Sequence, residues 1–188
     1  MVGGSVMSRI GNKPVVIPAG VTVNIDDTTN TITVKGKLGE LTQNYHKLLS
    51  AKTEGNEIIL SKRVDSKEAN MMHGTFRSLI NDMVIGVSEG FSKGLVINGV
   101  GYSAATNGDH QITMKLGYSH PVVYKADDDI KFSCPTATEI KVFGINKTKV
   151  GQVAADIRSK KPVEPYHAHG IRYADEVVVH KEGKTGKK

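Results

Sequence analysis

The sequence predicts an α+β protein with two tandem, duplicated domains, each a small antiparallel β-sheet covered by one helix. Two kinds of pattern predict this class: short stretches in which apolar and polar residues alternate, and two longer stretches with an apolar residue every three or four positions. The patterns occur in the same order in both halves of the chain. We therefore expect an N-terminal extension over residues 1–7, α/β domains over 8–85 and 86–178, and a basic tail over 179–188.

The first domain begins with strands. Residues 21–25 and 32–34 alternate apolar and polar side chains on either side of a polar turn at residues 26–30, and residues 58–60 form a third apolar stretch. Alternation of this kind buries one face of a strand and leaves the other face polar. A small antiparallel sheet follows from these three stretches.

A helix is expected next, with Asp65 or Ser66 as its N-cap. Apolar residues then recur at helical spacing and form one stripe, which is made of Ala69, Met72, Phe76, Leu79, Ile80 and Met83. We expect Phe76 and Leu79 to be buried and the helix to end near Gly86. The helix would cover the apolar face of the first sheet.

The same order of patterns begins again after Gly90. Residues 95–105, 111–117 and 139–145 are typical of strands. A second helix is expected after them, capped at Thr148, with an apolar face made of Val150, Val153, Ala154 and Ile157. The second domain therefore repeats the plan of the first.

Short repeated sequences support a duplication. Lys37-Leu38-Gly39 recurs as Lys115-Leu116-Gly117, and Glu57-Ile58 recurs as Glu139-Ile140. Because these echoes occur in the same order as the strand and helix patterns, they favour two copies of one sheet-plus-helix domain, joined near residues 85–92.

Composition and cysteine usage indicate a cytoplasmic globular protein. The chain is 38% hydrophobic and 23% charged, which is a globular composition, and its single cysteine, Cys134, cannot form an internal disulfide. The sequence shows neither a secretory signal nor a run of about 18 apolar residues. We expect no membrane contact, and Met7 offers a second start that would make residues 1–6 dispensable.

Positive charge is concentrated at the C-terminal end. The last 42 residues hold 10 of the 25 Lys and Arg residues but only 5 of the 19 Asp and Glu residues, so five of the six net positive charges lie there. A basic end of this kind predicts contact with a polyanion. For the final residues, 181–188, a solvated tail that only keeps the protein soluble is the alternative.

The motifs typical of enzymes are incomplete in this chain. The Gly99–Gly101 stretch has Ala104 where a dinucleotide-binding loop needs its third glycine, and Ser103 lacks the following helix that a nucleophile elbow needs. The acidic run at residues 127–129 lacks the glycine and the closing Glu of a calcium loop. We expect no enzyme activity, no catalytic residue and no cofactor.

The stretch PVEPYHAHGIRY, residues 162–173, allows two functional interpretations. As a metal site, His167 and His169 would lie on one side of an extended segment, but structural zinc needs further ligands, for which only Glu164 and Asp175 are near in sequence. As an RNA contact, the segment follows the cations Arg158, Lys160 and Lys161, and Tyr166, Arg172 and Tyr173 can stack on bases or bind phosphates. Simple packing of the tyrosines on the second domain is a third alternative, which leaves the charge unexplained.

Several longer motifs occur in an order that resembles the bacterial large-subunit ribosomal protein L-six family. They are SRIGNKPVVIPAGV, MVIGVSEGF, GVGYSAA, LGYSHPV, VGQVAADIR and EPYHAHGIRYADEVV, and together they span residues 8–178. The resemblance implies two similar α/β domains and a non-enzymatic role in translation. It also implies binding to large-subunit ribosomal RNA through the second domain and the C-terminal segment, near the elongation-factor site and the stalk base.

Two positions depart from the family pattern. Where the family usually has Lys-Gly-Lys-Gly after Glu-Pro-Tyr, this chain has residues 167–170, His-Ala-His-Gly, and the residue after the Gly-Val-Gly-Tyr motif is Ser103 instead of the common Arg. A histidine has an ordinary pKa of about 6.5 and can gain a proton near phosphate. His167 and His169 would then replace the lysines only in part.

The expected partners are large-subunit ribosomal RNA and neighbouring ribosomal proteins, with no membrane and no small-molecule substrate, in the cytoplasm on the ribosome. A free RNA-binding adaptor protein is the alternative function. We expect no bound metal. The predicted RNA-binding residues are Arg158, Lys160, Lys161, Tyr166, His167, His169, Arg172, Tyr173 and Lys181.

Overall fold

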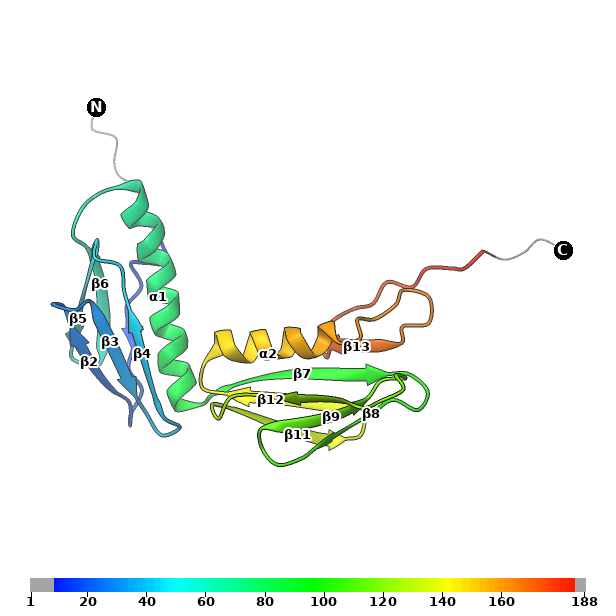
Figure 1. Cartoon of the computed structure of the whole chain (residues 1–188). Helices are drawn as coiled ribbons and strands as arrows, with labels where there is room; N and C mark the ends of the chain where they lie inside the picture. Colours follow the sequence, from blue (N-terminus) through cyan, green and yellow to red (C-terminus); the bar gives the residue numbers. More distant parts are fainter. Residues whose placement is uncertain (1–8, 185–188) are drawn as a thin grey trace. The chain divides into compact units, whose positions relative to one another are not determined.

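The computed structural model describes residues 9–184 and divides into two compact units, one ending at Gly90 and the other beginning at Phe91 (Figure 1). Each unit combines antiparallel β-structure with one helix, which confirms the predicted class of two tandem α+β domains. The extension expected over residues 1–7 and the last four residues of the expected tail lie outside the described residues. Within the described part of the chain, no helix is long and apolar enough to cross a membrane.

The first unit holds two three-stranded antiparallel sheets instead of the single sheet expected. One has the order β1-β6-β5 and the other the order β2-β3-β4. The strands are β1 (Val15–Val16), β2 (Thr22–Asp26), β3 (Thr31–Lys35), β4 (Glu40–Asn44), β5 (Leu49–Glu54) and β6 (Glu57–Lys62). In β3 the alternating Ile32 and Val34 are fully buried, as the sequence pattern predicts.

Helix α1 (Lys67–Ser88) packs against strands of both sheets in the first unit. Its N-cap is Ser66, whose side-chain oxygen accepts a hydrogen bond from the backbone nitrogen of Ala69 at 3.1 Å. The helix continues two residues past the expected end at Gly86. The capping residue therefore predicts the start of this helix correctly, whereas Gly86 does not mark its C-terminal end.

The buried face of α1 is rotated from the predicted stripe. Phe76 and Leu79 are only partly buried, which corrects the expectation that both would be fully enclosed. The innermost positions belong to Ala69, His73, Ile80, Met83, Val84, Gly86 and Val87. The pattern included the larger apolar residues at the edge of the stripe, because periodicity alone does not distinguish its centre from its edges.

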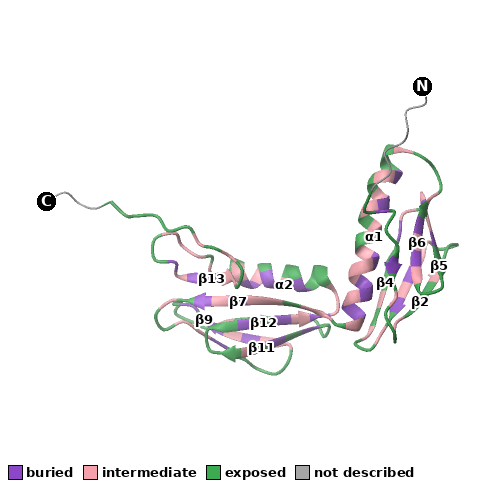
Figure 2. Ribbon diagram, turned by 180° about the vertical axis from the view of Figure 1, so that it is seen from behind, coloured by how far each residue is buried: buried purple, intermediate pink, exposed green. Residues whose placement is uncertain are grey.

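The second unit also holds two antiparallel sheets, of order β10-β9-β8 and β11-β12-β7-β13. Its strands are β7 (Phe91–Asn98), β8 (Ser103–Thr106), β9 (Gln111–Lys115), β10 (Val122–Lys125), β11 (Ile130–Thr136), β12 (Glu139–Gly144) and β13 (Gly170–Tyr173). Helix α2 (Lys147–Ser159) lies against β7, β12 and β13 (Figure 1). Its apolar side is buried there, whereas exposed residues follow its outer side (Figure 2).

The N-cap of α2 is Asn146 and not the expected Thr148. The Asn146 side-chain oxygen accepts hydrogen bonds from the backbone nitrogens of Thr148 at 3.0 Å and Lys149 at 3.3 Å. Asn is at least as good an N-cap as Thr, because its short side chain reaches the same free N–H groups. Three of the four residues of the predicted inner face, Val150, Ala154 and Ile157, are buried, whereas Val153 is only partly buried.

Strand pairing shows the duplication more clearly than the sequence echoes do. In the first unit β6 lies between β1 and β5, and in the second β12 lies between β7 and β11 in the same way. The other sheets also correspond, because β3 lies between β2 and β4, and β9 lies between β8 and β10. The Glu57 echo at Glu139 begins equivalent strands, β6 and β12. The Lys37 echo at Lys115 does not, because Lys37 follows β3 whereas Lys115 is the last residue of β9.

Strand β13 adds a fourth strand to one sheet of the second unit, next to β7. It pairs antiparallel with β7, with Arg172 opposite Val96 and Tyr173 opposite Leu95. Its Ile171 is fully buried in the core of this unit. The strand therefore fixes the end of the PVEPYHAHGIRY stretch on the sheet.

Candidate nucleic-acid interface

The PVEPYHAHGIRY stretch, which we call the return segment (residues 162–173), follows α2, folds back on itself and ends in strand β13. The backbone nitrogen of Ile171 donates to the carbonyl oxygen of Lys161 at 2.8 Å, and that of Glu164 donates to the oxygen of His169 at 3.1 Å. The Lys181 nitrogen also donates to the Pro165 oxygen at 2.9 Å, which ties the C-terminal segment to it. The return segment is thus held on both sides by backbone hydrogen bonds.

Arg158, a predicted RNA contact, is engaged within the second unit. Its Nε donates to Glu176 Oε2 at 2.9 Å, and a second guanidinium nitrogen donates to Oε1. Hydrogen bonding to Glu176 raises the pKa of Arg158, and the same contact lowers the pKa of Glu176. This pair joins α2 to the segment after β13. Because Glu176 already balances its charge, Arg158 is less available to bind a phosphate.

Tyr173 is likewise part of the packing. Its ring lies under the Arg158 guanidinium, 5.5 Å from the ring centroid, and under Lys93 Nζ, at 5.0 Å, and it packs against the core of the second unit. Tyr173 therefore packs on the second domain, as the third interpretation of this stretch expects. Tyr166 differs, because its side chain is 54% exposed.

Arg172, on β13, donates from one guanidinium nitrogen to the carbonyl oxygen of Glu176 at 3.0 Å. A guanidinium has five N–H donors, so this contact positions the group and leaves most of its donors for another acceptor. The side chain is only partly buried. Arg172 is therefore held at the surface in a fixed orientation.

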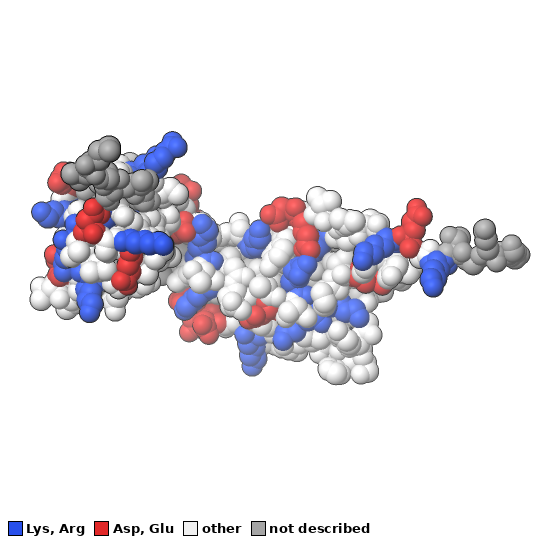
Figure 3. Space-filling model, turned by 90° about the horizontal axis from the view of Figure 1, so that it is seen from above, with Lys and Arg blue, Asp and Glu red and all other residues white. Residues whose placement is uncertain are grey.

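Three lysines provide the available positive charge at this surface. Lys160 and Lys181 are exposed, and neither forms an ion pair with any residue in the described range 9–184. Lys161 places its ammonium 5.0 Å from the centroid of the Tyr118 ring. On the face in Figure 3, Lys and Arg side chains are interspersed with Asp and Glu. Binding of a polyanion would therefore depend on individual unpaired cations and not on a uniformly basic face.

His167 and His169 face the same carboxylate. The Nδ1 atom of His167 lies 3.0 Å from Glu164 Oε1 and that of His169 lies 3.7 Å from it, and the two imidazole rings are stacked with centroids 5.6 Å apart. Asp175, the other ligand considered for a metal site, instead contacts Lys93 Nζ at 3.1 Å. Within residues 9–184, no three His, Cys, Asp or Glu side chains are arranged to hold a metal ion.

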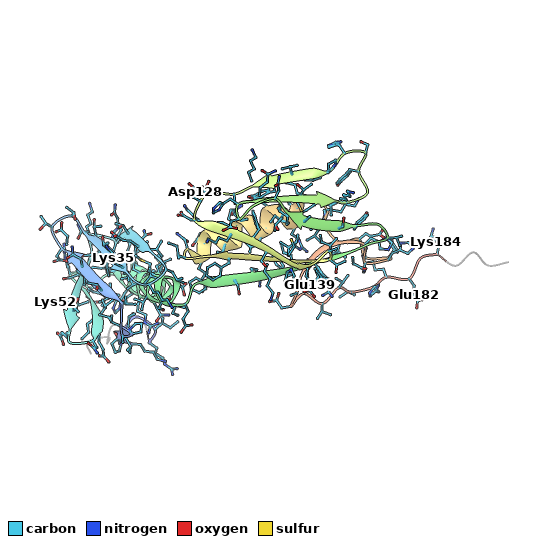
Figure 4. All side chains as sticks on the ribbon, turned by 90° about the horizontal axis from the view of Figure 1, so that it is seen from below. Lys35, Lys52, Asp128, Glu139, Glu182 and Lys184 are labelled. Atoms are coloured by element: carbon cyan, nitrogen blue, oxygen red, sulfur yellow. The ribbon has the colours of Figure 1, made fainter. Side chains whose placement is uncertain are left out.

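The other candidate sites have ordinary surroundings. Ser103 lies in strand β8 opposite Lys115, which is not the strand-to-helix turn of a nucleophile elbow. In the acidic run, Asp127 and Asp129 pair with Lys149 of α2. Asp128 lies in the turn before β11, as its label in Figure 4 shows.

Two tyrosines outside the predicted RNA-binding set lie beside the return segment. Tyr102 and Tyr118 line a surface hollow of about 460 Å³ together with Lys161, Pro162, Glu164 and His169. The Tyr118 hydroxyl donates to the carbonyl oxygen of Lys160 at 2.9 Å. The sequence signal for both was a glycine directly before each tyrosine, in the motifs GVGYSAA and LGYSHPV.

Comparison with known proteins gives a consistent result over nearly the whole chain. A family model described as ribosomal protein L6 matches residues 17–90 and 98–174, one stretch in each unit. The chain is 52% identical over 181 residues to a protein of Exiguobacterium sibiricum and 51% identical to one of Enterococcus faecalis, covering 96% of this chain and all of each relative. A Mesoplasma florum protein is 49% identical over 182 residues. All three are named large ribosomal subunit protein uL6, and the chain belongs to the ribosomal protein L6 family.

Proposed function

We propose that this protein is a structural constituent of the large ribosomal subunit and binds large-subunit ribosomal RNA through its second unit. The observation that carries this proposal is the match along 96% of the chain to relatives named large ribosomal subunit protein uL6. Its partners are then ribosomal RNA and neighbouring ribosomal proteins, on the ribosome in the cytoplasm. A position near the elongation-factor site and the stalk base rests on the family resemblance alone.

The RNA contact proposed here centres on Lys160, Lys161, Arg172 and Lys181, with Tyr166 as an exposed flat side chain. Phosphate groups bind to unpaired cations, and each lysine or arginine that neutralises a phosphate releases condensed counterions. The fixed fork of Arg172 can bind phosphate through two parallel hydrogen bonds. Lysines 160 and 161 follow the last residue of α2, so the helix and the backbone hydrogen bonds of the return segment position them together.

Two of the predicted contacts take a supporting role in this proposal. Arg158 pairs with Glu176, and the Tyr173 ring contacts both Arg158 and Lys93, so Arg158 and Tyr173 orient the strand that presents Arg172. Their contribution to RNA binding is indirect. A lost positioning contact weakens binding by allowing the interface to move, not by removing a phosphate ligand.

His167 and His169 stand where the family usually has two lysines. Glu164 lies beside both rings and competes with phosphate for their N–H groups. We therefore expect both histidines to contribute less to RNA affinity than Lys160 and Lys161, and replacement of both by Gln to lower that affinity only modestly.

Cosedimentation tests the class of function. In a sucrose gradient of cell lysate, a tagged chain should travel with large subunits and remain with them in moderate salt. A chain found only among small free proteins would contradict the ribosomal role and favour the free RNA-binding adaptor. An enzymatic role is not proposed, because the enzyme motifs are incomplete and Ser103 lies in a paired strand.

A further inference from the structure

Three separate motifs of the sequence meet around one hollow of the second unit. Tyr102 comes from GVGYSAA, Tyr118 comes from LGYSHPV, and the remaining lining residues come from the region of the return segment. We propose that this hollow, which we call the tyrosine hollow, binds one unstacked base of RNA. The inference rests on the proposed RNA-binding function and names the group that the second unit would recognise.

One wall of the tyrosine hollow is the ring of Tyr118. The side chain is 48% exposed, yet its hydroxyl is held by the hydrogen bond to the Lys160 carbonyl oxygen. The Lys161 ammonium lies 5.0 Å from the ring centroid and further restricts it. An exposed aromatic ring that is already oriented is the surface on which an unstacked base binds, because little conformational entropy is lost on stacking.

The second tyrosine is fixed by glycines. A Cβ atom at Gly99 would lie 2.6 Å from the Tyr102 ring, and one at Gly117 would lie 2.9 Å from it, so the ring lies directly against the backbone at both positions. A larger residue at either position would displace the ring. Gly99 and Gly117 therefore hold the Tyr102 ring in place, so this wall of the hollow is formed before any ligand binds.

The polar groups of the tyrosine hollow suit a base better than a phosphate. Glu164 lines the hollow, and its Oε2 accepts no hydrogen bond from any described residue. A carboxylate repels phosphate but accepts hydrogen bonds from the amino and imino groups on a base edge. Lys161 lines the hollow, and the adjacent Lys160 accepts the Tyr118 hydrogen bond through its carbonyl oxygen. Their ammonium groups can bind the phosphates on either side of the base.

Binding measurements with matched variants test this site. Each base stacked on an aromatic side chain contributes enough that its loss corresponds to a decrease in affinity of about 5- to 150-fold. Tyr118→Ala should therefore bind large-subunit RNA that much more weakly, whereas Tyr118→Phe, which lacks the same hydroxyl but keeps the ring, should retain most of the affinity. Thermal unfolding should be alike in both variants. Wild-type affinity in Tyr118→Ala would overturn the proposal.

Crosslinking in assembled subunits separates this inference from the general RNA-binding role. The photoreactive residue benzoylphenylalanine is placed at position 118, 123 or 166 of the full chain, and large subunits are purified after irradiation. Position 118 should crosslink to the base of one nucleotide that position 123, an exposed residue of β10, does not reach. Crosslinks to RNA from position 166 but none from 118 would overturn the base site and leave the proposed function intact. Absence of the wild-type chain from large subunits would overturn both.

Discussion

Ala168 shows how a single residue departs from the conformation that its side chain prefers. It lies in the left-handed region with φ of 57°, and its carbonyl oxygen accepts a hydrogen bond from Asn98 Nδ2 at 3.0 Å. A residue with a Cβ atom loses about 1–2 kcal/mol in this region, which glycine avoids. We expect Ala168→Gly to raise the free energy of unfolding by up to about 1 kcal/mol in urea denaturation.

The same substitution inside a helix is the control for Ala168. Ala154 is fully buried in α2, where glycine is less favourable than alanine by about 1 kcal/mol before any loss of packing is counted. Ala154→Gly should therefore destabilise the protein. Equal destabilisation by both substitutions would contradict the left-handed conformation at residue 168.

The ion pair between Arg158 and Glu176 gives a stability effect with a defined pH dependence. Its hydrogen bonds, together with one from the backbone nitrogen of Tyr173, lower the pKa of Glu176 from its ordinary value of 4.5. A lowered folded-state pKa means that the contribution is fully present above pH 4.5 and is lost as the pH falls through the folded-state pKa. Glu176→Gln should cost about 1 kcal/mol at pH 7 and much less at pH 3, measured by thermal unfolding. A constant difference at both pH values would argue against the pair.

At the scale of elements, α1 stabilises the first unit through a narrow buried stripe. Ile80 has no exposed surface, whereas Phe76 is only partly buried. Ile80→Ala should therefore lower the free energy of unfolding by about 2–5 kcal/mol, and Phe76→Ala should cost less than the full value for a buried phenylalanine. Ser78→Ala, on the exposed side of the helix, serves as the control in urea denaturation. A larger loss for Phe76 than for Ile80 would restore the stripe expected from sequence.

The junction of α2 and the return segment carries the charge that we assign to RNA binding. Replacing Lys160 and Lys161 together by Ala should lower the slope of log affinity against log salt by up to about 1.5, because the loss of two phosphate contacts reduces the number of counterions released on binding. The control pair is Lys35 and Lys52 of the first unit, both labelled in Figure 4 and both exposed. An equal change of slope in the control would show that the effect is not confined to the proposed surface.

Deletion of the tail separates the fixed interface from the end of the chain. Glu182 and Lys184 lie on the C-terminal segment that follows β13 (Figure 4). Removing residues 181–188 should weaken RNA binding less than the double lysine replacement, because it removes one of the proposed phosphate contacts, Lys181, whereas the double replacement removes two. If the deletion abolishes binding while the double variant binds normally, the tail, and not the return segment, is the docking surface.

For the whole molecule, periodic patterns predicted the duplicated α+β plan but not every strand. Strands with alternating buried residues, such as β3 and β9, are visible in the sequence, whereas β4 has a single partly buried apolar residue, Leu41, and gives no such pattern. Strand β13 is defined by its pairing with β7, which lies more than 70 residues earlier. Local sequence contains no information on such a pairing, so β13 is not predicted. The predicted strands also leave out β1, β4, β5, β10 and β11.

The candidate site was predictable in its location more than in its contacts. Composition and charge selected the return segment and its flanking lysines. The partnership of Arg158 with Glu176 and the position of Tyr118 beside Lys160 depend on the tertiary fold, since Tyr118 and Lys160 are 42 residues apart. Residue type therefore indicates which groups can bind RNA, and the fold determines which of them are already occupied.

The central claim is that unpaired lysines of the second unit bind RNA in the assembled large subunit. Lysine acetylation followed by mass spectrometry, applied to the free protein and to purified large subunits, tests it most directly. We predict that Lys160, Lys161 and Lys181 react in the free protein and are protected in the subunit, whereas Lys52 reacts in both. Equal reactivity of Lys160 and Lys161 in the two samples would contradict the proposed interface.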